Sequence, residues 1–139
     1  FRAIVKSYFR DLDVVILVID VTDMYSLELI EKWDTDLDYI NKNENIIKIL
    51  VGNKIDSPDR CIDKIDAEEV SNRYGYTYFE TSCKKKDTID NLFNNIIKII
   101  HQQKITKKIN LKKTIDSLDK KNVLSCQVKK KKFTWCSIL

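Results

Sequence analysis

Apolar runs alternate with helical patterns along the first hundred residues of the chain. Residues 14–19 and 46–51 are almost wholly apolar, which is typical of strands buried on both faces of a parallel sheet, and residues 76–80 form a shorter, aromatic-rich run. Between and after these runs, apolar residues return every three or four positions over residues 27–40, 66–74 and 89–100, as in amphipathic helices. The alternation of strand and helix predicts an α/β fold with a parallel sheet and right-handed crossovers.

Polar residues at the ends of these segments predict where the helices begin and stop. Asp23 or Ser26 can cap the helix over residues 27–40, and Trp33 lies on its apolar stripe, where we expect a core role. Asp66 and Glu69 are spaced as in a capping box, and Gly75 is expected to end that helix.

Two polar clusters follow two of the predicted strands. Asn53, Lys54 and Asp56 come directly after the second apolar run, and Ser82-Cys83-Lys84 comes after the third. Since the carboxyl ends of parallel strands meet at one edge, where α/β sheets bind ligands, we expect the clusters to converge. A carboxylate such as Asp56 can accept two parallel hydrogen bonds from the ring N–H and exocyclic amine of guanine, a donor pair that adenine lacks.

The other two residues of the first cluster suit the same base. Asn53 offers both a donor and an acceptor, and Lys54 can lay its methylene stem along the base while its ammonium stays in water. The alternative is an ordinary polar turn after a strand, because Asn and Asp are common turn residues.

Charge divides the chain into an acidic body and a basic tail. Residues 1–103 carry 14 Lys/Arg against 19 Asp/Glu, whereas residues 104–139 carry 11 Lys against 2 Asp. We therefore expect a small globular unit over residues 1–103, then a frayed helix that passes into a disordered basic tail. Such a tail suits phosphates of lipid or nucleic acid. The four cysteines show no CxxC or metal-ligand spacing, which favours a cytosolic protein with reduced thiols.

Four segments in unbroken order resemble the Rab branch of the Ras-like small GTPases. Phe1-Arg2-Ala3-Ile4 with Tyr8-Phe9-Arg10 is similar to the end of the family's second switch, and residues 18–23 (VIDVTD) to its characteristic strand end. Residues 51–56 (VGNKID) match its NKxD guanine motif, and residues 80–84 (ETSCK) are similar to its ETSAK motif. The resemblance covers about residues 1–103 and implies the three-layer P-loop NTPase (Ras-like) fold, of which this would be the C-terminal part.

The resemblance also implies a role for each residue of the two clusters. Asn53 and Asp56 would read guanine in GTP or GDP, and Lys54 would pack over the base and sugar. Ser82 would support Asp56, and the backbone N–H of Cys83 would donate to the guanine carbonyl. Cys83 stands where the family usually has alanine, a change that a backbone contact survives; Lys84 completes the motif.

The motifs of the family that bind phosphate and magnesium do not occur in this sequence. It contains no GxxxxGK[ST] loop and no DxxG, and the first-switch threonine is not found either. We therefore interpret the chain as a fragment that would need the missing part to bind Mg²⁺. Alone, it is expected to bind GTP weakly or not at all. It is also expected to be poorly soluble, because the strand over residues 13–21 would become an exposed, wholly apolar edge.

The last four residues, Cys136-Ser137-Ile138-Leu139, have the C-a-a-X form of a prenylation signal. A final leucine favours geranylgeranyl, and Lys129 to Lys132 just upstream would add attraction to an anionic membrane. The alternatives are a free terminal cysteine and a solvated or nuclear-targeting lysine run. The sequence thus predicts a lipid anchor on the cytoplasmic face of a membrane and not a secreted protein.

The leading hypothesis is a Rab-like GTPase that acts as a membrane-bound switch in vesicle traffic, with effector and regulator proteins as partners. The alternative is a truncated or decayed relative that is prenylated and binds partners without hydrolysing GTP. A nucleic-acid-binding protein is disfavoured because the body is acidic and no RNA-binding motif is found.

Overall fold

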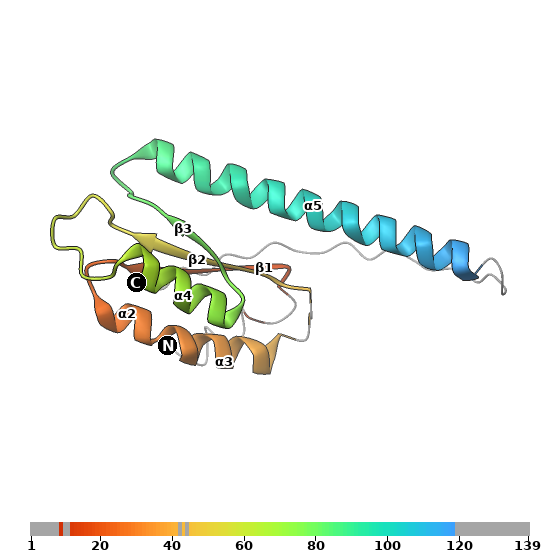
Figure 1. Cartoon of the computed structure of the whole chain (residues 1–139), viewed down its shortest axis with the longest axis horizontal. Coiled ribbons are helices and arrows are strands. Elements are labelled where there is room, and N and C mark those ends of the chain that lie inside the picture. Colours follow the sequence, from red (N-terminus) through yellow and green to blue (C-terminus); the bar gives the residue numbers. More distant parts are fainter. Residues whose placement is uncertain (1–8, 10–11, 42, 44, 119–139) are drawn as a thin grey trace. The chain divides into compact units, whose positions relative to one another are not determined.

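The computed structural model describes residues 9, 12–41, 43 and 45–118 of the chain (Figure 1). Strands and helices alternate through most of this part, as the hydrophobic pattern predicts. In chain order the elements are β1 (Val14–Asp20), α2 (Met24–Glu28), α3 (Ile30–Ile40), β2 (Ile47–Asn53), α4 (Lys64–Tyr74), β3 (Thr77–Glu80) and α5 (Lys86–Leu118).

The three strands form one parallel sheet in the order β1-β2-β3. β1 and β2 pair from Val14 opposite Ile47 to Asp20 opposite Asn53. β3 continues the sheet, with Glu80 opposite Gly52. The predicted α/β fold with a parallel sheet is therefore confirmed, and all three strands end at one edge.

The hydrophobic core lies between the sheet and helices α2, α3 and α4. Side chains of β1 and β2 are buried here because their runs are apolar at nearly every position. Phe9 packs edge-on against Trp33, with ring centroids 6.2 Å apart, which confirms the core role expected for Trp33. The core cluster comprises Phe9, Leu12, Val15, Leu17, Ile19, Val21, Leu27, Ile30, Leu37, Leu50, Ile62, Ala67 and Tyr76.

Within the described residues, β1 pairs only with β2, so it lies at the edge of the sheet as expected. Its apolar side chains, however, are not exposed. Val14 and Ile16 are at most 8% exposed, and Val15 and Leu17 are more deeply buried. The prediction of poor solubility remains a prediction.

The helices begin at slightly different positions from those the sequence predicts. The first helix is divided at Leu29 into α2 and α3, and Asp23 caps α2 by accepting a hydrogen bond from the Tyr25 N–H at 3.1 Å. The prediction that Asp66 begins α4 in a capping box is wrong: Asp63 is the N-cap residue, and Asp66 lies inside the first turn. Gly75 does end α4, in the left-handed region at φ 75°.

Helix α5 extends beyond the expected boundary near residue 103. Its 33 residues include the lysine-rich segment for which the sequence predicts a frayed helix. No glycine or proline occurs after Gly75, so this segment contains no residue that would stop a helix. Among the described residues, those from Phe93 to Leu118 belong to a second compact unit. No helix in the described part of the chain is long and apolar enough to cross a bilayer. The predicted disordered tail from residue 119 lies outside the described residues.

Candidate functional site

Backbone hydrogen bonds tie together the segments that follow the three strands. The Val21 N–H donates to the carbonyl of Asn53 at 3.0 Å, which joins the end of β1 to the end of β2. The Thr81 N–H donates to Gly52 at 2.8 Å, and the Ile55 N–H donates to Thr81 at 3.3 Å. The two polar clusters therefore lie next to each other at the carboxyl edge, as the parallel arrangement predicts.

Asp56 receives side-chain partners from the second cluster. The Ser82 hydroxyl donates to Asp56 Oδ1 at 2.5 Å, and the Lys84 ammonium lies 2.9 Å from Asp56 Oδ2. The hydrogen bond from Ser82, followed by that from Lys84, lowers the pKa of Asp56 to about 2. The carboxylate is thus ionised at neutral pH, and its two oxygens have more acceptor capacity than these two bonds use.

The hydroxyl of Ser82 also receives a bond, from the Lys84 N–H at 3.2 Å. Because Ser82 is fully buried, it holds Asp56 in a fixed position. The Lys84 side chain is 84% exposed, so its ion pair with Asp56 is weak and easily replaced.

Asn53 connects the two clusters from the other side. Its Oδ1 accepts a hydrogen bond from the Thr81 hydroxyl at 3.3 Å and a weaker one from the Cys83 thiol at 3.6 Å. Since the amide oxygen is used inside the protein, the NH₂ group is suited to donate to an acceptor on a ligand. Cys83 is exposed, and its thiol contacts Asn53.

Lys54 has a partner that the sequence did not predict. It adopts the left-handed region at φ 67°, and its ammonium lies 2.5 Å from Asp20 Oδ2, while 52% of its side chain is exposed. The hydrogen bond to Asp20 raises the pKa of Lys54. Burial alone would raise the pKa of Asp20, but hydrogen bonds from Lys54 and Thr22 outweigh it and hold that pKa below its usual value.

Asp20 is a site residue that the sequence reasoning did not identify. It ends β1 opposite Asn53, and its Oδ1 accepts from both the N–H and the hydroxyl of Thr22, at 3.0 and 2.8 Å. The available signal was its place at a strand's carboxyl end. A cavity of about 220 Å³ lies beside the Asp20–Lys54 pair, and Asn53 also lines it.

An ion pair and two hydrogen bonds, also not identified from the sequence, fix the loop after Asp56. Arg60 lies 2.5 Å from Glu80 Oε1 and donates through Nε to the carbonyl of Ile62 at 2.7 Å. The Tyr78 hydroxyl donates to the same oxygen of Glu80 at 3.2 Å. These bonds join the loop over residues 57–63 to the end of β3.

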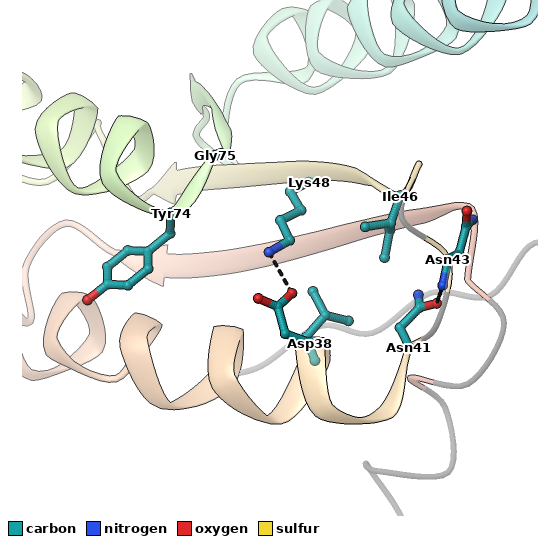
Figure 2. A pocket seen from close by; sticks show the side chains of 8 residues that line it. Asp38, Asn41, Asn43, Ile46, Lys48, Tyr74 and Gly75 are labelled. Carbon is teal, nitrogen blue, oxygen red and sulfur yellow. Dashed lines mark hydrogen bonds and ion pairs between the residues drawn. The ribbon is translucent and has the colours of Figure 1, made fainter. Parts of the chain in front are cut away.

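A larger pocket of about 540 Å³ lies at the opposite end of the strands (Figure 2). Lys48 reaches toward it and donates to both Asp34 and Asp38 at 2.8 Å. Asn41 and Asn43 on its wall bond to each other and to the backbone. Because this pocket contains neither of the two polar clusters that the sequence singles out, the carboxyl edge is the better candidate site.

The sequence model of the Ras family matches residues 1–102 of the chain. The chain belongs to the Ras family. Its fold is therefore a part of the Ras-like P-loop NTPase fold, in agreement with the parallel sheet and with the fold class that the sequence predicts.

Rab proteins are among the most similar relatives of this Ras-family chain, which confirms its resemblance to the Rab branch. It is 35% identical over 102 residues to Ras-related protein Rab-18 of Caenorhabditis briggsae, an alignment that covers 73% of this chain and 50% of the relative. It is 33% identical to Ras-related protein Rab-42 of Mus musculus (73% and 47% covered) and 35% identical to Ras-related protein RABE1d of Arabidopsis thaliana (74% and 48% covered). The chain spans about half the length of each relative.

The six predicted binding residues thus form three sets of side-chain contacts at this edge: Asp56 with Ser82 and Lys84, Asn53 with Cys83, and Lys54 with Asp20. No cluster of metal ligands is found among the described residues. The predicted lipidation site, Cys136, lies outside them.

Proposed function

We propose that this Rab-like chain forms the guanine-reading part of a small GTPase that binds GTP and GDP. The observation that carries the proposal is the bond from the buried Ser82 hydroxyl to Asp56. It holds an ionised carboxylate at the carboxyl edge of the sheet, where a base could approach.

The hydrogen-bond donors and acceptors of these residues fit guanine. Asp56 accepts from the ring N–H and the exocyclic amine, and the NH₂ of Asn53 donates to an acceptor on the opposite edge of the base. The backbone N–H of Cys83 donates to the guanine carbonyl, and the stem of Lys54 covers the base. Adenine would leave Asp56 without its donor pair, so the site rejects it.

The chain's own residues bind and orient the base. Chemistry on the γ-phosphate requires phosphate-binding and magnesium-binding groups, whose motifs this sequence does not contain. That observation also favours the second candidate function, a prenylated binding module that does not hydrolyse GTP. Hydrolysis by the complete gene product separates the two.

The GTPase is further proposed to act as a membrane-bound switch in vesicle traffic, with effector and regulator proteins as partners. A geranylgeranyl group on Cys136, assisted by Lys129 to Lys132, would hold it at the cytoplasmic face of a membrane. Loss of the membrane-bound fraction in Cys136→Ser supports this anchor, and an unchanged fraction rejects it.

The guanine site is tested by comparing two buried serines in the complete gene product. Ser82→Ala removes the hydroxyl that bonds Asp56; Ser71→Ala removes an equally buried hydroxyl that bonds the carbonyl of Ala67 at 2.7 Å in α4. Fluorescent GDP is displaced by unlabelled GDP or ADP. We expect Ser82→Ala to weaken GDP binding roughly 10-fold or more, because it loosens a charged hydrogen bond. Ser71→Ala should bind GDP almost normally.

Equal GDP affinity of the two variants, or equal displacement by ADP and GDP, would reject the guanine site. The 139-residue chain alone is expected to bind GTP weakly or not at all, and sub-micromolar, magnesium-dependent binding would contradict that expectation.

A further inference from the structure

The hydroxyl of Thr88 connects the second polar cluster to the start of α5. The Ser82 N–H donates to Thr88 Oγ1 at 3.0 Å, across six residues of the chain. The same hydroxyl donates to the carbonyl of Lys85 at 2.7 Å and lies 3.1 Å from the carbonyl of Ser82. A hydroxyl has one donor and two acceptor lone pairs, so it holds the N–H and a carbonyl at the same time.

The bond to Thr88 completes the fixation of Ser82, which is fully buried. The carbonyl of Ser82 accepts from the Lys85 N–H at 2.9 Å. Its hydroxyl accepts from the Lys84 N–H at 3.2 Å and donates to Asp56 at 2.5 Å. A buried N–H without an acceptor is costly, so we expect Ser82 to shift when the hydroxyl of Thr88 is removed.

The same turn presents the backbone of Cys83. The N–H groups of Ser82, Lys84 and Lys85 all donate inside the turn. Within the described residues, the N–H of Cys83 has no such partner, so it is available to an acceptor on a ligand. A shift of Ser82 would therefore change the direction of this N–H as well as the position of Asp56.

We propose that Thr88 is a positioning residue for guanine recognition. Its hydroxyl fixes Ser82, and Ser82 in turn holds the carboxylate of Asp56 and sets the direction of the Cys83 N–H. The inference rests on the proposed guanine-binding function, to which it adds a residue that acts through Ser82 instead of on the nucleotide itself.

The alternative role for this hydroxyl is to stabilise the first turn of α5 alone. Thr35 is an example of such a role, since its hydroxyl donates to the carbonyl of Glu31 at 2.8 Å within α3. Thr88 makes a comparable bond to Lys85 but also accepts from Ser82, which lies outside α5. This additional bond is the one that reaches the polar cluster.

The test measures the binding of GDP, IDP and ADP to the complete gene product by displacement of fluorescent GDP. The base of IDP is hypoxanthine, which lacks the exocyclic amine from which Asp56 would accept a hydrogen bond. Thr88→Val and Thr88→Ala remove the hydroxyl, whereas Thr88→Ser retains it. The matched control, Thr35→Val, removes the hydroxyl that donates to Glu31.

We expect Thr88→Val and Thr88→Ala to weaken GDP binding roughly fivefold, the effect of about one lost hydrogen bond. Most of this loss, roughly threefold, should be a smaller preference for GDP over IDP, because a displaced Asp56 no longer reads the amine. Thr88→Ser and Thr35→Val should bind like wild type. Val matches Thr in helix propensity and Ala exceeds it, so urea denaturation should show that the variants fold.

A variant that was only less stable would lose GDP and IDP binding equally. Such an equal loss would overturn the role of Thr88, as would unchanged GDP affinity in both Thr88→Val and Thr88→Ala, or a loss in Thr88→Ser as large as theirs. If wild type still prefers GDP to ADP, these outcomes leave the guanine site standing. A wild type that binds ADP and GDP equally would reject the guanine site and this inference together.

Discussion

Gly52 has no room for a side chain, which makes it the sharpest test of how the site is packed. It lies at the end of β2, directly before Asn53. A Cβ added there would clash with the Tyr78 hydroxyl and lie 3.1 Å from Tyr78 Cζ and 3.0 Å from Val21 Cγ1. Such contacts are tighter than real packing tolerates, so Gly52→Ala must move Tyr78 or the strand.

The cost can be worked out from these contacts. Overpacking by one methyl group costs about 1–3 kcal/mol, and movement of Tyr78 also weakens its 3.2 Å hydrogen bond to Glu80, worth about 1 kcal/mol. We expect Gly52→Ala to lower the free energy of unfolding by about 2–3 kcal/mol. In Tyr78→Phe the clashing oxygen is gone, so the double variant should be about 1 kcal/mol more stable than the sum of the single effects predicts.

Urea denaturation followed by far-UV circular dichroism measures the free energy of unfolding of wild type, the two single variants and the double variant. One contradicting result is a free energy of unfolding of Gly52→Ala within about 0.5 kcal/mol of the wild-type value, and another is simple addition of the effects of the two substitutions on it. Either result would show that Tyr78 does not pack against Gly52 as described.

Three further predictions concern charge and backbone strain. Because the pKa of Asp56 is lowered from 3.8 to about 2, its contribution to stability is complete above pH 3.8 and lost as the pH falls toward 2. NMR titration of the carboxyl carbon should show Ser82→Ala moving this pKa back toward 3.8; no change would contradict the role of Ser82. Lys48→Met leaves the buried carboxylate of Asp34 without its ammonium and should cost about 2 kcal/mol in urea denaturation, whereas a neutral effect would show that the pair is dispensable. Gly75→Ala meets no neighbouring atom but must adopt φ 75°, so the same assay should show a loss of about 1 kcal/mol, and no loss would mean that the helix end relaxes.

The sequence was sufficient to predict how the two clusters meet. Apolar runs define the strands, and parallel strands bring the residues that follow them to one edge, whatever the loops between them do. The bond from Ser82 to Asp56 is expected from the family resemblance, and the structure contains it. The end of α4 at Gly75 could be predicted because helices often end at a residue in the left-handed region, which glycine adopts most easily.

Partners of long charged side chains could not be predicted. Lys54 pairs with Asp20, and Arg60 pairs with Glu80, through contacts between segments far apart in the chain. Hydrophobic periodicity defines the backbone elements but carries no information about which rotamer an exposed lysine or arginine adopts. The sequence predicts a frayed helix after residue 103, and α5 continues through this segment to Leu118, because no glycine or proline there stops a helix.

The proposed guanine-reading site is tested most directly by a change of base. Guanine offers Asp56 two donors, whereas xanthine replaces the exocyclic amine by a carbonyl, which the amide NH₂ of an asparagine can bind. In the complete gene product, Asp56→Asn should therefore weaken GDP binding roughly 1000-fold and bind XDP more tightly than GDP. If Asp56→Asn still prefers GDP to XDP, this carboxylate does not read the base.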